Sequence, residues 1–129
     1  MKDILVPLSP GEMLDKITIL RIKAARMSDP VKVANVKHEL ALLEKTWRDS
    51  GAAAVDIGDE EANLTRVNEK LWVIEDEIRD EERAKRFGEK FIELARSVYV
   101  VNDERAAIKK RINTAMGSTI VEEKSYQSY

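Results

Sequence analysis

Two polar residues interrupt the apolar face of a long predicted helix near the C-terminus of this 129-residue chain. Residues 88–116 repeat apolar side chains at three- and four-residue spacing, which predicts one amphipathic helix. Asn102 and Arg105 fall near the centre of its apolar face. A buried amide or guanidinium is costly unless it is partnered, so the pair predicts either a structural polar network or a binding site.

The preceding predicted helix carries a second line of polar side chains beside its own apolar stripe. This ridge consists of Asn68, Trp72, Glu75 and Arg79. The spacing i, i+4, i+7 and i+11 places all four on one side of the helix, where Glu75 and Arg79 can pair. Trp72 is large and amphipathic, so the ridge is expected to pack half-buried against a neighbour or to line a groove.

Arg105 needs carboxylate or carbonyl partners, because a guanidinium has five donors and no acceptor. If the two long helices form an antiparallel hairpin with a tip near residue 86, Arg105 lies within about one turn of Glu75. Glu75 is therefore the first choice of partner, Asp15 the second, and Asn102 a neutral helper. The candidate ligand- or partner-binding residues are Asp15, Asn68, Trp72, Glu75, Arg79, Asn102 and Arg105.

Three interpretations of these residues stay open from the sequence. They can form a buried network that fixes helix register, an anion or polar-ligand site in a bundle core, or a surface pair. Asp15 lies on the first predicted helix, so its participation depends on how that helix packs.

Catalytic and metal-binding templates fit the chain poorly. There is no cysteine, and His38 is the single histidine, so no catalytic residue, metal ligand or cofactor is predicted. One enzyme template stays as the alternative, a helical magnesium-dependent nucleotide pyrophosphohydrolase with an EExxE…ExxD pattern. Glu77 and Asp80 supply the ExxD spacing, but Glu60 and Glu61 are followed by leucine where the pattern needs glutamate. The main hypothesis is a non-catalytic binding or assembly module that takes a protein partner or a polar small molecule.

Composition limits the range of partners. The chain has 22 Lys and Arg against 24 Asp and Glu, for a formal charge of −2. A balanced chain has no electrostatic signature for nucleic acid or an anionic membrane. It contains neither a secretory signal nor an apolar run of about 18 residues, so no membrane span is expected and a cytoplasmic location is predicted.

The elements that must position the polar residues are four helices. Capping residues indicate where the helices begin and end: Ser9-Pro10-Gly11-Glu12, Ser28-Asp29-Pro30 and Gly117. Asp59 is expected to cap the third helix. The predicted fold is all-α, a single domain over residues 1–129, and a four-helix bundle of two antiparallel hairpins. The expected helices are residues 10–27, 30–50, 59–85 and 88–116, followed by a tail over 117–129.

The two ends of the chain hold short apolar segments. Residues 4–6 and 119–121 are candidates for a small two-strand pairing, and the tyrosines Tyr126 and Tyr129 suggest that the tail docks. The longer hairpin is expected to overhang the shorter one. We expect this overhang to leave Leu64 and Ile112 uncovered. Ile19 and Ile22 add a further apolar patch, which either the N- or C-terminal segment or a second subunit is expected to cover. A homodimer is predicted to cover them.

Four segments together resemble an uncharacterised bacterial family, one of the domains of unknown function. The segments are VPLSPGEMLDKITILRIK, VNEKLWVIEDEIR, FIELARSVYVVNDERAAIKKRIN and EEKSY. The resemblance covers most of the chain and implies an all-helical bacterial protein. It also implies a role near surface-polysaccharide synthesis, because members accompany glycosyltransferases or helical-repeat proteins. No catalytic residue is carried over from it.

Overall fold

The computed structural model describes residues 1–129 and confirms the all-α prediction. The helices are α1 (Pro10–Arg26), α2 (Pro30–Asp49), α3 (Gly58–Arg83) and α4 (Glu89–Ala115), with a 3₁₀ turn η1 (Ala52–Ala54) after α2. Each α-helix begins and ends within two residues of the range expected from the sequence. None of them is long and apolar enough to cross a membrane.

Local capping explains where most of the helices begin and end. The Ser9 hydroxyl accepts a hydrogen bond from the Glu12 backbone N–H at 3.3 Å, and the Asp29 carboxylate accepts one from the Val31 N–H at 3.0 Å. Gly117 follows α4 with a φ of +66°, the left-handed conformation that glycine adopts most easily.

The cap expected at Asp59 is wrong. Helix α3 begins one residue earlier, at Gly58, whose N–H donates to the Asp56 carboxylate at 3.1 Å. Asp56 and Asp59 both lie close to the start of the helix, and aspartate is a common capping residue. The sequence pattern therefore did not show which of the two accepts the hydrogen bond there.

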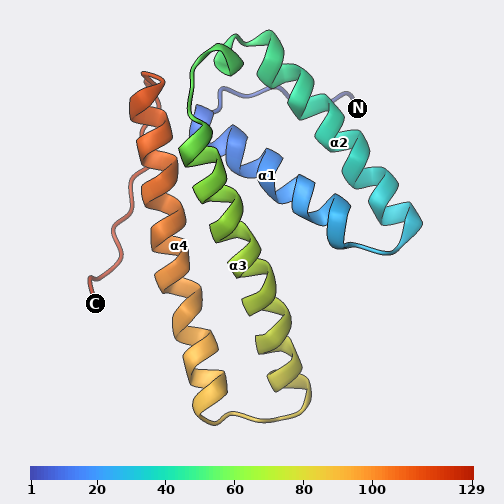
Figure 1. Ribbon diagram of the computed structural model, residues 1–129, viewed down its shortest axis with the longest axis vertical. Coiled ribbons are helices and arrows are strands. Elements are labelled where there is room, and N and C mark those ends of the chain that lie inside the picture. Colours follow the sequence, from blue (N-terminus) through green and yellow to red (C-terminus); the bar gives the residue numbers. More distant parts are fainter.

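Helices α3 and α4 form a long antiparallel hairpin, and α1 crosses one half of it (Figure 1). Helix α1 contacts both hairpin helices, whereas α2 packs on the outer side of α1 and buries no residue fully. The core therefore lies between α1 and the open end of the hairpin. It is built from Leu14, Ile57, Leu64, Val67, Val101, Ile108 and Ile112.

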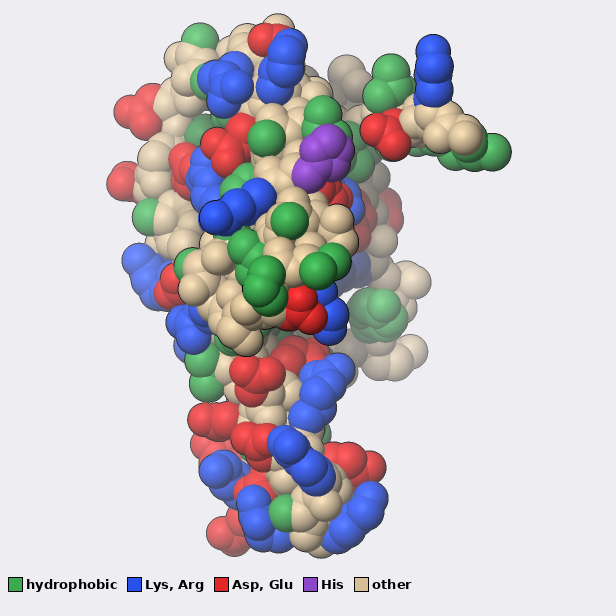
Figure 2. All heavy atoms as spheres, turned by 90° about the vertical axis from the view of Figure 1, so that its right-hand side faces the viewer, with side chains coloured by type: hydrophobic (Ala, Val, Ile, Leu, Met, Phe, Trp, Pro, Cys, Tyr) green, Lys and Arg blue, Asp and Glu red, His purple; other side chains and the backbone are tan.

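The closed end of the hairpin extends beyond α1 and is rich in charge. Acidic and basic side chains alternate over this tip, as the lower part of Figure 2 shows. Glu81 is buried there, with 4% of the residue exposed, and accepts a hydrogen bond from Arg86 Nε at 2.6 Å. This pairing holds the turn that joins α3 to α4.

The strand pairing of the two termini does not form. Ile4 and Leu5 are 79% and 93% exposed, and neither terminal segment is a strand. After Gly117 the tail turns back along α4, so the two ends leave the helices in different directions (Figure 1). Tyr129 does contact α4, where its hydroxyl donates to the Asp103 carboxylate at 2.5 Å.

Most of the apolar surface that a second subunit was expected to cover is buried within the chain. Leu64 and Ile112 are fully buried, and Ile22 is only 5% exposed, because α1 crosses the hairpin at their level. The overhang lies instead toward the closed end of the hairpin. Exposed apolar residues there include Val73, Ile92, Tyr99 and Val100.

Candidate functional site

A buried carboxylate on α1 organises the polar residues. Asp15 is 1% exposed, and its Oδ1 accepts hydrogen bonds from Asn68 Nδ2 of α3 and Arg105 Nε of α4, each at 2.9 Å. The second oxygen, Oδ2, accepts from Arg105 Nη2, so the guanidinium binds the carboxylate through two nitrogens. Asn68 Nδ2 also donates to the Thr18 hydroxyl at 3.0 Å. One acid therefore ties three helices together.

A glycine lets α1 come close enough to place this acid. The Gly11 N–H donates to Asn113 Oδ1 of α4 at 2.7 Å. A Cβ at Gly11 would lie 2.5 Å from the backbone oxygen of Lys109, so any larger residue would push the helices apart. Since Asp15 follows one helical turn after Gly11, the close approach brings its carboxylate to Arg105.

In the pair of Asp15 and Arg105, the carboxylate is buried and the guanidinium is partly exposed to solvent. The Arg105 side chain is 27% exposed, and the hydrogen bond that it donates to Asp15 raises the pKa of its guanidinium above the usual value, against desolvation. Arg105 Nη1 lies 3.4 Å from Asn102 Oδ1, a long contact. The guanidinium is thus fixed in place while part of its donor set faces outward.

The outward side of Arg105 is a cleft of about 500 Å³ between α1 and the hairpin. Its lining combines Ile19 and Ile22 of α1 with Leu71, Trp72, Asp76 and five other polar candidates. The structure brings six of the seven candidates to this cleft. These are Asn68, Trp72, Glu75, Arg79, Asn102 and Arg105. Asp15, the seventh, lies behind Arg105 and holds it.

The first choice of partner for Arg105 was wrong. Glu75 forms its ion pair with Arg79 on its own helix, in the i, i+4 arrangement that the ridge predicted. Asp15, the second choice, is the actual partner of Arg105. The spacing of residues along the α3–α4 hairpin does not show how α1 packs, and it is α1 that places a carboxylate directly over Arg105.

Sequence reasoning missed Lys109 and Glu12 as members of the same polar group. Lys109 Nζ donates to Glu12 Oε2 at 2.9 Å and lies 3.8 Å from Asp15 Oδ2. Lys109 follows Arg105 by four residues, so its place on the same helix face was a usable signal. Thr18 was missed as well, three residues after Asp15 and fully buried.

The cleft combines hydrogen-bond donors and acceptors around Arg105. Asn102 and Trp72 add an amide and an indole donor beside Arg105, and Glu75 and Asp76 add acceptors. No group of three or more His, Cys, Asp or Glu side chains is placed to hold a metal ion. The cleft can offer hydrogen bonds of both kinds next to an aromatic ring and an aliphatic wall.

Comparisons with known proteins give one match. No curated protein and no solved structure matches the chain. The model of a family of unknown function, DUF6165, matches residues 4–129. With nearly the whole chain matched, the protein belongs to this family of unknown function, DUF6165.

Proposed function

We propose that this protein is a non-catalytic binding or assembly module whose cleft takes a polar small molecule such as a sugar nucleotide. The observation that carries the proposal is the fixed guanidinium of Arg105. Asp15 holds it from the buried side, while its remaining donors face a cleft beside Trp72. A donor held in position before the ligand arrives loses little conformational entropy on binding.

The mixture of groups in the cleft favours a ligand with hydroxyl groups and a flat apolar face. Sugar hydroxyls both donate and accept, which matches amide, guanidinium and carboxylate groups lying side by side. Trp72 offers a broad ring against which a sugar or a base can stack. Glu75 and Asp76 offset the charge of Arg79 and Arg105, so a highly charged polyanion gains less from this cleft.

A place in surface-polysaccharide synthesis is consistent with this chemistry. It rests on the resemblance of the quoted sequence segments to a family whose members accompany glycosyltransferases. On this proposal the protein acts within the cytoplasm and binds an activated sugar or a partner that carries one, without itself breaking a bond.

The magnesium-dependent pyrophosphohydrolase is less well supported. Such an enzyme needs several carboxylates converging on one point. Glu77 and Asp80 are both exposed, and Asp80 pairs with Arg83. Asp15, the buried acid behind the cleft, meets a guanidinium, an ammonium and an amide instead.

A thermal-shift measurement with uridine diphosphate glucose tests the proposal. We expect the sugar nucleotide to raise the melting temperature of the wild-type chain, with little effect on Arg105→Met or Trp72→Leu. Arg111→Met is the matched control, because Arg111 pairs with Glu60 away from the cleft and its loss should leave the shift intact.

Two outcomes would count against the binding module. An equal shift in Arg105→Met would mean that the ligand binds elsewhere. A shift by a nucleotide that appears only with magnesium would favour the enzyme.

A further inference from the structure

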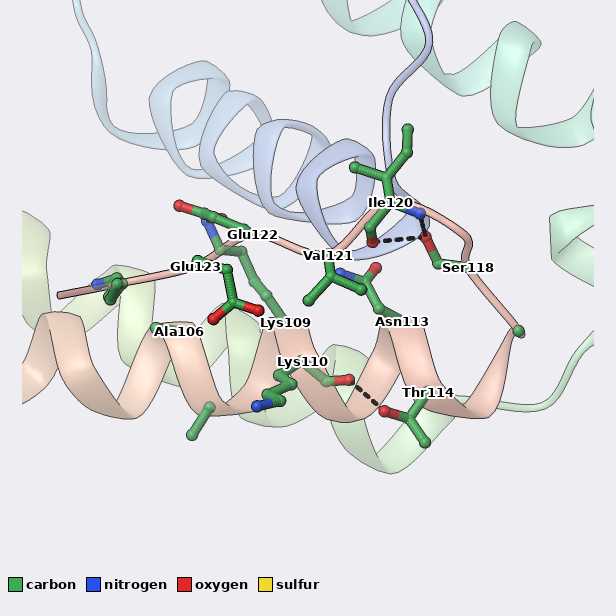
Figure 3. Close-up of a pocket in the computed structure, with 13 residues that line it drawn as sticks. Ala106, Lys109, Lys110, Asn113, Thr114, Ser118, Ile120, Val121, Glu122 and Glu123 are labelled. Atoms are coloured by element: carbon green, nitrogen blue, oxygen red, sulfur yellow. Dashed lines mark hydrogen bonds and ion pairs between the residues drawn. The ribbon is translucent and has the colours of Figure 1, made fainter.

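The buried Asp15 lies close to two cationic side chains, Arg105 and Lys109, which face different sides of the molecule. Arg105 lines the cleft, whereas Lys109, one turn further along α4, faces the C-terminal tail, residues 117–129. The Lys109 ammonium lies 3.8 Å from Asp15 Oδ2 and 3.6 Å from Glu122 Oε2 of the tail. Figure 3 shows Lys109 reaching from α4 to the tail beside Glu122. One carboxylate therefore stands between the cleft and the tail.

Few contacts hold the tail on α4. The Glu122 side chain is 58% exposed, and Tyr129 is held by Asp103 and by the edge of the Tyr99 ring, with ring centres 5.2 Å apart. A space of about 500 Å³ separates the tail from α4 around Val121. Exposed ion pairs contribute little stability, so the tail can leave α4 without uncovering the hydrophobic core.

The charges around Asp15 do not balance, and this makes the two faces interdependent. Three carboxylates, Glu12, Asp15 and Glu122, share the two cations Arg105 and Lys109. The hydrogen bond that Arg105 donates to Asp15 raises the pKa of Arg105 most, and the negative charges of Glu12 and Glu122 raise it further. The negative charge of Glu122 in the tail therefore stabilises the charged form of Arg105 in the cleft.

We infer that the tail regulates the cleft, because docking of Glu122 on Lys109 and binding of an anionic ligand at Arg105 oppose each other through Asp15. The inference rests on the proposed function and deepens it. A ligand phosphate bound by the outward donors of Arg105 competes with Asp15 for the charge of the guanidinium, which stays in place, and Lys109 is the next cation near Asp15. Lys109 then moves toward Asp15 and away from Glu122, which frees the tail. Linkage makes the effect reciprocal, so a free tail favours the ligand.

The first test needs no ligand. Heteronuclear ¹⁵N NOE values of residues 119–125 in the full chain report how firmly the tail is held. Arg105→Met should lower them, because Lys109 turns to the stranded Asp15. Lys109→Met should lower them directly. Arg79→Met is the control, since Arg79 lines the same cleft without touching Asp15, and it should leave the values unchanged.

Two results would overturn the link in this test. Lys109→Met with wild-type NOE values would show that Lys109 does not hold the tail. Folded Arg105→Met with wild-type values would show that the cleft and the tail are independent. Should Arg105→Met fail to fold, Lys109→Met still decides whether the tail is anchored there.

The second test measures affinity for uridine diphosphate glucose by calorimetry. Glu122→Gln should bind about 2- to 5-fold more tightly than the wild type, the range set by one exposed ion pair. Glu123→Gln is the matched control, because it removes the same charge from the neighbouring residue, which has no ion-pair partner, and should bind as the wild type. Equal affinities for both variants would overturn the coupling. Absence of binding to the wild-type chain would instead overturn the proposed function, while the NOE values still decide the link between Arg105 and the tail.

Discussion

At the scale of single residues, the packing of α1 on the hairpin depends on the ion pair between the buried Asp15 and Arg105. Asp15 is 1% exposed and accepts four hydrogen-bond or ion-pair contacts from Asn68, Arg105 and Lys109. Removing one partner from a buried ion pair is far more destabilising than the pair is stabilising, because the remaining charge has lost its solvent. The same bond that fixes the Arg105 guanidinium is thus part of what holds α1 on the hairpin.

Arg105→Ala should therefore lower the free energy of unfolding by about 3 kcal/mol, the range for stranding a buried partner. Arg79→Ala removes the same kind of side chain from the same cleft, but Arg79 is 69% exposed and pairs only along its own helix. It should leave the unfolding midpoint unchanged. Urea unfolding followed by circular dichroism measures both variants. Equal midpoints for the two variants would show that the pair with Asp15 carries no stability.

At the scale of elements, the turn between α3 and α4 contains a local strain. Lys85 has a φ of +58°, the left-handed region that β-carbons disfavour. It follows the end of α3, where the Arg86 N–H bonds back to the Glu81 carbonyl at 2.9 Å and closes the helix. Glycine is the usual residue at this position of such a turn, so the chain keeps a lysine where glycine would be less strained.

Lys85→Gly is expected to raise the free energy of unfolding by about 0.5–1 kcal/mol, because it relieves the left-handed strain. Lys85→Ala keeps the Cβ and removes the charge, so it should change stability by less than about 0.5 kcal/mol. Thermal unfolding followed by circular dichroism compares the two variants with the wild type. Destabilisation by glycine would mean that the flexibility it adds to the unfolded chain outweighs the relieved strain.

At the scale of the whole molecule, the closed half of the hairpin lacks a covering layer. Helix α1 protects the open half, but beyond it α3 and α4 have only each other, and Leu94 is the one apolar side chain of α4 that is buried there. Ile92, Tyr99 and Val100 lie exposed on α4, at 54%, 43% and 39%. A second hairpin laid against this surface would complete a four-helix arrangement.

Self-association therefore stays a prediction, with its surface moved from Leu64 and Ile112 to the closed half of the hairpin. Multi-angle light scattering at tens of micromolar should give twice the chain mass of 14.7 kDa. Ile92→Glu combined with Val100→Glu should yield the monomer, because each variant would bury a charge at the interface. Val31→Glu, an exposed position on α2, is the control and should remain dimeric. A wild-type mass of 14.7 kDa would refute the prediction.

The sequence by itself determined the helices, most of their caps, the polar ridge on α3 and the polar pair Asn102 and Arg105 on α4. These follow from local rules, since the 3.6-residue repeat assigns each side chain to a face and Ser9, Asp29 and Gly117 mark helix ends. The ridge pair Glu75–Arg79 was predictable for the same reason.

Only the tertiary structure decided which acid meets Arg105 and where the tail lies. Periodicity fixes what faces what within a helix or a hairpin, but it does not say how a third helix approaches. The position of α1 depends on the close contact at Gly11, which lets α1 pack tightly against α4. This contact places Asp15 between Arg105 and Asn68. The tail likewise docks through Glu122 and Lys109, 13 residues apart in sequence. No local pattern records that contact, because it exists only once the chain has turned at Gly117.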